Sequence, residues 1–518
     1  MALALAVDSP RASSPVTART LGGWIIPLAV VATMALRLPF LLSSPSPDEA
    51  GFLMVGAGWH SGGTSLYGNY WVDRPPLLIG LFRLSSSLGG LTALRLLGCI
   101  AAGLIVLGSS VTAGMIAGRP AARWAAIVAA ALCTTPLLGT VPVNGELLAA
   151  PFIVGSIAAA VKALGAAGDR RAAQFAVAAG AAAMCALLVK QNFADAFIFG
   201  LVATTIAWRR GDISGRRATR VLVSAGGGAA LATFAVALVT SLLGTSLSGV
   251  FAAMYPFRFA AAQVMAEAGR QHAAGRLDVL LATSVASGMT LLIGMVSWAA
   301  VSRRLAGAAV IGLSVTLSFA AISIAAGGNY WAHYLVEPIV PLAILTGVLI
   351  ARKLPFLKPL AVVVVAASAV VWSFELAVSH PSTGSTVGHS IAASAKPGDT
   401  LVTAYGRADI NQTSGLSSPY RYLWSLPIKT LDPQLTELNL VLSGPRSPTW
   451  FVTWNNVKSW GLQTDAVQAT VQREYHPVAR MCGRTIYLRN DIKRPTPHTQ
   501  ANCASSSALG TASKGKLP

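Results

Sequence analysis

The chain has 518 residues, of which 54% are hydrophobic and only 11% are charged. Its mean hydropathy is +0.60, and soluble domains carry about 25% charged residues, so a water-soluble globular protein is excluded. The net charge is +20, but the basic residues form short clusters between apolar runs, which disfavours a face for nucleic-acid binding.

Apolar runs long enough to cross a hydrocarbon core of about 30 Å recur up to residue 378. They predict an all-α polytopic membrane protein with about eleven transmembrane helices. The predicted spans are 21–43, 93–117, 122–140, 147–165, 172–189, 192–208, 221–243, 279–301, 305–326, 334–351 and 359–378.

With these spans, all the basic clusters of the membrane part fall on one side of the bilayer. They are Arg11/Arg19, Arg119/Arg123, Lys162/Arg170/Arg171, Arg209/Arg210/Arg216/Arg217/Arg220, Arg303/Arg304 and Arg352/Lys353/Lys358. Because Lys and Arg favour cytoplasmic loops, that side is predicted to be cytoplasmic. We expect a multi-pass protein of the plasma membrane with a cytoplasmic N-terminus and an extracytoplasmic C-terminal region.

The acidic residues of the membrane part show the complementary pattern. Those in outer loops or near the outer ends of spans are Asp48, Glu49, Asp73, Glu146, Asp195, Glu337 and Glu375. Ionisable groups at membrane depth are costly and usually serve a function. This one-sided distribution predicts a cavity that opens outward.

The sequence after residue 378 changes character. Strand-prone runs at 400–405, 449–454 and 485–488 alternate with Pro, Gly and Ser turns, which predicts a small extracytoplasmic α/β domain over 379–490. The composition of 491–518 predicts a disordered tail. A disulfide between Cys482 and Cys503 suits the extracytoplasmic side, although a disordered tail argues against it.

Two motifs in the first outer loop carry a specific resemblance. Ser46-Pro47-Asp48-Glu49 follows the first span, and Asp73-Arg74-Pro75-Pro76-Leu77 comes about two dozen residues later. This arrangement resembles the GT-C glycosyltransferases of the protein O-mannosyltransferase and lipid A aminoarabinose transferase superfamily. Three later segments match in order: Asn144-Gly145-Glu146, Lys190-Gln191 and residues 328–334.

The resemblance implies a role for each of these groups. Sugar transfer from a polyprenyl phosphate needs a base for the acceptor hydroxyl and cations for the leaving phosphate. Asp48 takes the role of base, and Glu49 and Glu146 position the acceptor or share a divalent metal. Arg74 and Lys190 bind the donor phosphate.

Other predicted substrate-binding residues are Asp73, Tyr330, His333, Tyr334 and Arg258. Arg258 belongs to a basic, aromatic segment of a long outer loop, with Tyr255, Arg270, His272 and Arg276. Such a segment would close over a lipid phosphate, and an interfacial helix attracted by anionic headgroups fits it equally well.

Several residues also have a purely structural interpretation. Asp48 and Glu49 fit the cap of a loop helix. Arg74 and Lys190 fit interfacial side chains that extend toward the headgroups. His333, among Tyr330, Trp331 and Tyr334, fits an aromatic belt.

Taken together, the motifs predict a hexosyl- or pentosyltransferase that moves a sugar from a polyprenyl phosphate to an extracytoplasmic glycan, protein or lipid, with inversion. A divalent metal is the one cofactor left open. A secondary transporter or lipid flippase is the alternative, and a non-catalytic scaffold is weaker still. Transport is disfavoured because no internal repeat is visible and the acidic residues lie in one outer layer.

The orientation can be tested directly. A reporter that is active only in the cytoplasm should be silent when fused after Leu488, because the span number and the basic clusters both place this residue outside. A strong signal would reverse the topology and, with it, the side on which the motifs lie.

Overall fold

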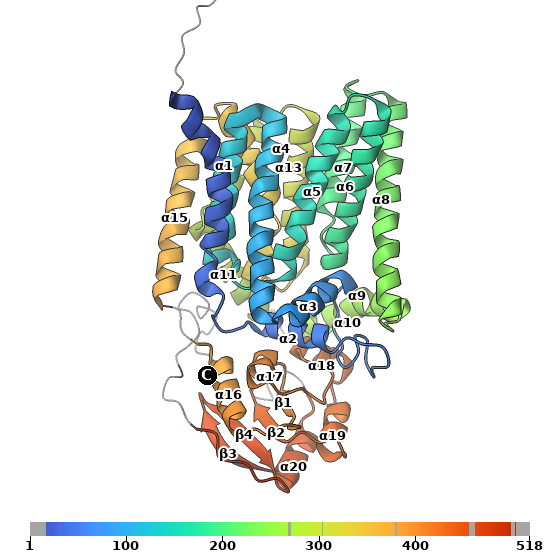
Figure 1. Cartoon of the computed structure of the whole chain (residues 1–518), viewed down its shortest axis with the longest axis vertical. Helices are drawn as coiled ribbons and strands as arrows, with labels where there is room; N and C mark the ends of the chain where they lie inside the picture. The colour runs from blue at the N-terminus through green and yellow to red at the C-terminus, as the bar shows by residue number, and fades with distance from the viewer. Residues whose placement is uncertain are drawn as a thin grey trace, which may run out of the picture.

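The computed structural model describes residues 17–267, 271–302, 304–378, 381–454, 462–498 and 503. Figure 1 shows a bundle of long helices with a smaller unit, which contains a β-sheet, at one end. The first helix starts at the end of the bundle far from the sheet, and the chain crosses to the other end before it enters the smaller unit.

Long apolar helices make up the bundle. They are α1 (Thr17–Ala35), α4 (Leu91–Thr134), α5 (Gly145–Gly165), α6 (Asp169–Val189), α7 (Asp195–Arg209), α8 (Gly215–Leu242), α11 (Gln271–Ala286), α12 (Met289–Val301), α13 (Ala308–Ala326), α14 (Ile339–Ala351) and α15 (Leu357–Val378). Within the described ranges, eight helices are long and apolar enough to cross a membrane, or nine when the bent pair α11 and α12 counts as one span.

The difference from the eleven predicted spans has geometric causes. Helix α4 has 44 residues, about 66 Å at 1.5 Å per residue, which is roughly twice the hydrocarbon core. Its backbone leaves the helical conformation at Ala117 and Gly118, and a Cβ on Gly114 would lie 3.2 Å from that of Ala122. The chain therefore turns back at this point, and the predicted spans 93–117 and 122–140 fall on the two sides of the turn.

Two other predicted spans are shorter or broken. The segment predicted over 192–208 forms α7, which has only 15 residues. The segment predicted over 279–301 is divided between α11 and α12, which are bent by 75°. Every predicted span thus coincides with a helix of the bundle, and the orientation of the bundle in the membrane remains a prediction.

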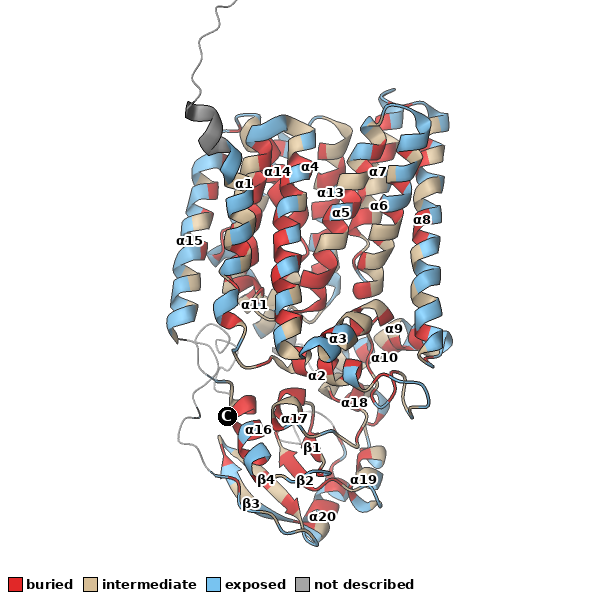
Figure 2. Cartoon of the chain, in the orientation of Figure 1, coloured by how far each residue is buried: buried red, intermediate tan, exposed pale blue. Residues whose placement is uncertain are grey.

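Burial separates a central helix from the outer ones. The window over Ala332–Ala351, which contains α14, is 83% buried, whereas that of α8 is 17% buried. Figure 2 shows α8 and α15 with mostly exposed outer faces. These faces are apolar, with side chains such as Leu231, Phe234 and Val370 exposed, as expected where lipid replaces water.

A layer of short helices lies between the bundle and the sheet (Figure 1). It contains α2 (Pro47–Ala57), α3 (Pro76–Leu88), α9 (Leu247–Met254) and α10 (Pro256–Glu267). Three 3-10 turns, η1 (Leu38–Phe40), η2 (Pro136–Leu138) and η3 (Ala332–Val336), precede or follow long helices. A proline at the first position of α2, α3 and η2 helps to begin each of these segments, because its fixed φ suits the first turn of a helix.

The C-terminal unit, residues 381–498, contains a four-stranded sheet of order β1-β2-β4-β3. Its elements are α16 (Thr383–Ser394), β1 (Leu401–Ala404), α17 (Ala408–Ser414), α18 (Ser425–Leu431), α19 (Thr436–Ser443), β2 (Trp450–Thr453), α20 (Asp465–Glu474), β3 (Tyr475–Met481) and β4 (Arg484–Arg489). The three predicted strand runs form β1, β2 and β4. Strand β3 was not predicted, because Pro477 interrupts its pattern; it lies at the edge, where a proline is tolerated.

The end of the C-terminal unit is tied back to the sheet. Cys482 and Cys503 form the disulfide that the sequence left open, with their Cα atoms 5.2 Å apart. Arg494 pairs with Asp399 at 2.6 Å, so the described start of the predicted tail packs on this unit. Residues 499–502 and 504–518 of that predicted tail lie outside the described residues.

Candidate active site

The predicted site residues gather where the bundle meets the layer of short helices. They come from the start of α2, the loop before α3, the start of α5, the end of α6, the start of α10 and turn η3. Each lies at or next to a helix end, where the backbone turns and a side chain can leave the packed core.

Asp48 is the second residue of α2, and its side chain does not cap the helix. Ser46 is the N-cap: its hydroxyl accepts from the backbone N–H of Glu49, whose carboxylate accepts in turn from the Ser46 backbone. Asp48 Oδ1 instead accepts a hydrogen bond of 2.8 Å from Nε1 of Trp424. The capping interpretation therefore applies to Ser46 and Glu49, and the Asp48 carboxylate is left for another role.

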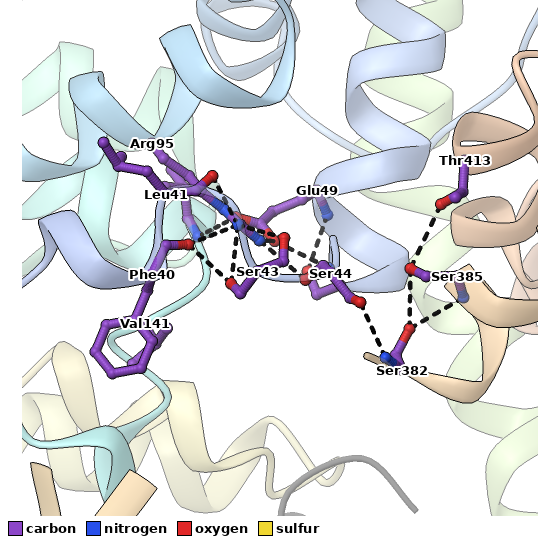
Figure 3. Close-up of polar contacts among 12 residues, drawn as sticks. Phe40, Leu41, Ser43, Ser44, Glu49, Arg95, Val141, Ser382, Ser385 and Thr413 are labelled. Carbon is purple, nitrogen blue, oxygen red and sulfur yellow. Dashed lines mark hydrogen bonds and ion pairs between the residues drawn. The ribbon is translucent and has the colours of Figure 1, made fainter. Parts of the chain in front are cut away.

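Glu49 is fully buried and forms an ion pair of 3.1 Å with Arg95 of α4. Its Oε1 also accepts from the backbone N–H of Val143 at 3.0 Å. Figure 3 shows Arg95 surrounded by the carbonyl groups of Phe40, Leu41, Ser43 and Ser44, with Glu49 on its other side. Every polar atom of this pair has a partner, so its geometry suits a structural connection.

Asp73 holds two guanidinium groups side by side. Its Oδ1 lies 2.8 Å from Arg74 and its Oδ2 lies 2.8 Å from Arg258. Burial alone would raise the pKa of the Asp73 carboxyl, but the two facing cations outweigh burial and lower that pKa below its usual value. The ionised carboxylate offsets the repulsion between the arginines, which are both partly exposed.

Arg74 lies within the electrostatic reach of several site groups. Burial tends to lower the pKa of Arg74, but the carboxylates of Asp73 and Asp48 favour its charged form, and the pKa is raised. Its guanidinium also lies 5.7 Å from the ring centroid of Phe52, the next turn of α2 after Asp48. Asp48, Asp73 and Arg74 therefore belong to one cluster.

Glu146 and Lys190 form a second ion pair beside it. His333 Nε2 lies 3.5 Å from the same Glu146 oxygen, and the Lys190 ammonium lies 4.8 Å from the ring centroid of Tyr334. The side chain of Gln191 donates to the backbone carbonyl of Asp73 at 3.3 Å and so joins the two clusters. Lys190 is thus held by an acid and an aromatic ring inside the protein, which does not fit a side chain extended to the interface.

The other predicted residues lie at the margin. The Tyr330 hydroxyl donates to the carbonyl of Ala325 at 3.3 Å, and the residue has a φ of 52°. Arg276 donates to the carbonyl of Asn329 at 2.7 Å and lies 5.1 Å from the Trp331 ring. These contacts shape the turn that carries His333. The side chains of Arg270 and His272 lie outside the described residues.

A divalent metal shared by Glu49 and Glu146 does not fit these contacts. Glu49 is occupied by Arg95 and backbone N–H groups, and Glu146 is paired with Lys190. In the described part of the chain, no group of three or more His, Cys, Asp or Glu residues is arranged to hold a metal ion.

Two residues of the site were not predicted from the sequence. Arg95 lies within the predicted span 93–117, and an arginine inside an apolar run is a signal that sequence analysis can use. Trp424 reaches Asp48 from 376 residues away. Nothing local in the sequence around Trp424 identifies that contact.

An apolar groove of about 860 Å³ lies along α3. It runs between α3 and the end of α8 and is lined by residues such as Pro76, Leu77, Val239 and Leu243. Pro76 and Leu77 are two and three positions after Arg74 in the chain, and the charged residues of the candidate site are not among the groove's lining residues.

No family profile matches the sequence, and no curated protein matches it. Solved structures do match. ArnT from Cupriavidus metallidurans bound to undecaprenyl phosphate gives a TM-score of 0.61 at 14% identity over 91% of this chain and 98% of that one. The apo form of ArnT gives 0.58 at 12% identity over the same shares, 91% and 98%.

A more distant match is the oligosaccharyltransferase AglB from Archaeoglobus fulgidus in complex with an inhibitory peptide and a dolichol-phosphate. Its TM-score is 0.50 at 12% identity, over 96% of this chain and 77% of that one. These likenesses confirm the predicted fold: the chain shares the overall architecture of ArnT and AglB.

The structural role of the Glu49–Arg95 pair makes a prediction about stability. Arg95→Ala should lower the free energy of unfolding by about 3–5 kcal/mol, because it leaves the Glu49 carboxylate buried without its cation. Thermal unfolding of the purified protein in detergent measures this loss. Arg473→Ala is the control, since Arg473 pairs with Glu474 on an exposed face and should change stability by only about 0.5 kcal/mol. Equal stability of the two variants would contradict the structural role.

Proposed function

We propose that the chain is a glycosyltransferase that moves a sugar from a polyprenyl-phosphate donor to an acceptor on the extracytoplasmic side of the membrane. The observation that carries this proposal is one arrangement: Asp73 holds the guanidinium groups of Arg74 and Arg258 side by side, and the Asp48 carboxylate lies within electrostatic reach of Arg74. A lipid-linked phosphate needs a cationic head site joined to an apolar channel.

The donor binds through both of its parts. Its prenyl chain lies in the groove between α3 and α8, where apolar walls replace the lipid tails. Its phosphate lies against Arg74, Arg258 and Lys190. Guanidinium groups suit this task because their N–H groups form a planar fork that pairs with two phosphate oxygens. The undecaprenyl phosphate and dolichol-phosphate bound by ArnT and AglB support this choice of donor.

The reaction is a single displacement at the anomeric carbon of the sugar. The Asp48 carboxylate takes the proton of the acceptor hydroxyl, and the acceptor oxygen forms the new bond to the anomeric carbon. The bond from that carbon to the phosphate oxygen breaks, and the polyprenyl phosphate leaves with the electron pair. The three cations stabilise its added charge. Because the carboxylate acts as a base and forms no covalent intermediate, the configuration is inverted.

The remaining groups shape the sugar site. The ion pair of Glu146 with Lys190, together with His333 and Tyr334, supplies acceptors, donors and an aromatic ring beside the phosphate. Glu49 takes no part in the reaction, since its contacts are all structural. The charged groups lie at one end of the bundle, next to the C-terminal unit, and this position supports transfer over transport through the bundle.

The overall activity can be tested in cells. Mass spectrometry of cell-envelope glycans, glycoproteins and lipids, with and without this protein, should show a sugar that depends on it. An unchanged set of all three classes would contradict a transferase.

The phosphate assignment predicts a graded loss of binding. Arg74→Ala should weaken binding of undecaprenyl phosphate by about 10- to 100-fold, since hydrogen bonds to charged groups contribute about 1.5–3 kcal/mol. Arg74→Lys should weaken it less, because the ammonium keeps the charge and loses the fork. Lys190→Ala should also weaken binding.

Binding can be measured with the protein in nanodiscs, and Arg480→Ala is the control, since Arg480 is an exposed residue of the edge strand β3. Unchanged affinity in both Arg74→Ala and Lys190→Ala would remove these residues from the phosphate site.

The role of Asp48 predicts a loss of chemistry without a loss of binding. Asp48→Asn keeps the shape of the side chain but removes the basic carboxylate, so turnover should fall by about 10²- to 10⁴-fold. Affinity for undecaprenyl phosphate should change little, because the cations carry it. The measurement compares sugar transfer, lipid binding and thermal stability in the two forms. Near-normal transfer by Asp48→Asn would refute the base assignment.

A further inference from the structure

The C-terminal unit is docked directly on the loop that carries the candidate base. The backbone N–H of Ser382 donates to the Ser44 hydroxyl at 2.9 Å, as Figure 3 shows. The backbone N–H of Trp71 donates to the carbonyl of Arg421 at 3.1 Å. The core of the bundle also includes Leu423 of this unit. The unit is therefore one wall of the site region and is not a separate appendage.

Trp424 is the residue of this wall that reaches the site. It precedes α18, and its indole packs on the Phe52 ring with centroids 5.0 Å apart. The helix α2 makes room for it at Gly51, where a Cβ would overlap Cζ2 of the indole and lie 2.8 Å from Cη2. The ring thus occupies a position that only glycine permits, and its Nε1–H donates to Asp48 Oδ1.

This single hydrogen bond determines the orientation of the Asp48 carboxylate. The indole N–H is a donor only, so it orients the carboxylate and cannot take its proton. Within the described residues, no hydrogen bond reaches Asp48 Oδ2, which is the oxygen left for an acceptor hydroxyl. Without Trp424, the nearby charge of Arg74 would draw the carboxylate into an ion pair. A base that is paired with the phosphate-binding arginine is lost for proton transfer.

We propose that Trp424 is a positioning residue for sugar transfer, and that the C-terminal unit thereby completes the active site. This proposal rests on the proposed function, because it gives Trp424 its effect through the base Asp48. The unit supplies a neutral hydrogen-bond donor to Asp48, while the bundle and the layer of short helices supply the charged side chains.

The test is Trp424→Phe, which keeps an aromatic ring on Phe52 but removes the indole N–H. The turnover number should fall by about 10- to 100-fold, the loss expected for one hydrogen bond to a charged group. The Michaelis constant for undecaprenyl-phosphate-linked mannose or arabinose, with a cell-envelope extract as acceptor, should stay the same. If Trp424 had only a structural role, Trp424→Phe would lower the thermal stability, or would change the turnover number and the Michaelis constant together.

A second variant perturbs the contact between Trp424 and Asp48 through a residue of α2. Gly51→Ala should displace the indole and give the same kinetic pattern without changing Trp424 or Asp48. Gly155→Ala is its control, since nothing lies within 4 Å of a Cβ there. Trp450→Phe is the control for the indole, because Trp450 Nε1 also donates to a carboxylate, that of Asp399 at 3.2 Å, away from the site. Both controls should keep the wild-type turnover number.

A spectroscopic measurement separates this proposal from the proposed function. In protein labelled with ¹⁵N-tryptophan, the indole resonance that disappears in Trp424→Phe should move in Asp48→Ala. An unmoved resonance, or wild-type turnover by Trp424→Phe, overturns the positioning role alone. Wild-type protein that transfers no sugar overturns the proposed function, and the positioning role with it, even when the resonance moves.

Discussion

The buried ion pair between Glu49 and Arg95 is the interaction on which the site depends. Taking two charges out of water costs several kcal/mol for each, and only a full set of partners offsets that cost. Here the partners come from three places: the turn after α1, the start of α2 and the loop before α5. Asp48 directly precedes Glu49, and Glu146 follows Val143 by three residues. One structural pair therefore sets the positions of two acids of the candidate site.

The charged side chains of the candidate site are also paired with groups of opposite charge. Asp73 lies between two arginines, and Glu146 lies against a lysine. Each basic side chain is thus oriented before any ligand arrives, which reduces the reorganisation needed on binding. The arginines remain partly exposed, so a phosphate can add to the clusters without breaking them. The groove along α3 supplies an apolar surface whose lining begins two positions after Arg74 in the chain.

Hydrophobic patterning predicts the helices of the bundle well, because a bilayer imposes a length that soluble proteins lack. It does not show that α7 is short or that α11 and α12 are bent, since those features depend on neighbouring helices. The motifs identify Asp48, Asp73, Arg74, Glu146 and Lys190, which the structure brings together. They do not distinguish the structural Glu49 from the adjacent Asp48, because that difference comes from Arg95. The contact of Trp424 with Asp48 cannot be predicted from local patterns, because it joins residues 376 positions apart.

The contact between Trp424 and Asp48 also has a consequence for biosynthesis. The two residues are 376 positions apart, so a growing chain inserts the loop with Asp48 long before the ribosome reaches the segment with Trp424. During that interval the loop is exposed without its orienting partner. If Trp424 positions Asp48 as proposed, full activity begins only when synthesis is almost complete and the C-terminal unit has folded against the loop. A prematurely terminated chain would keep its acids and arginines, yet remain a poor catalyst.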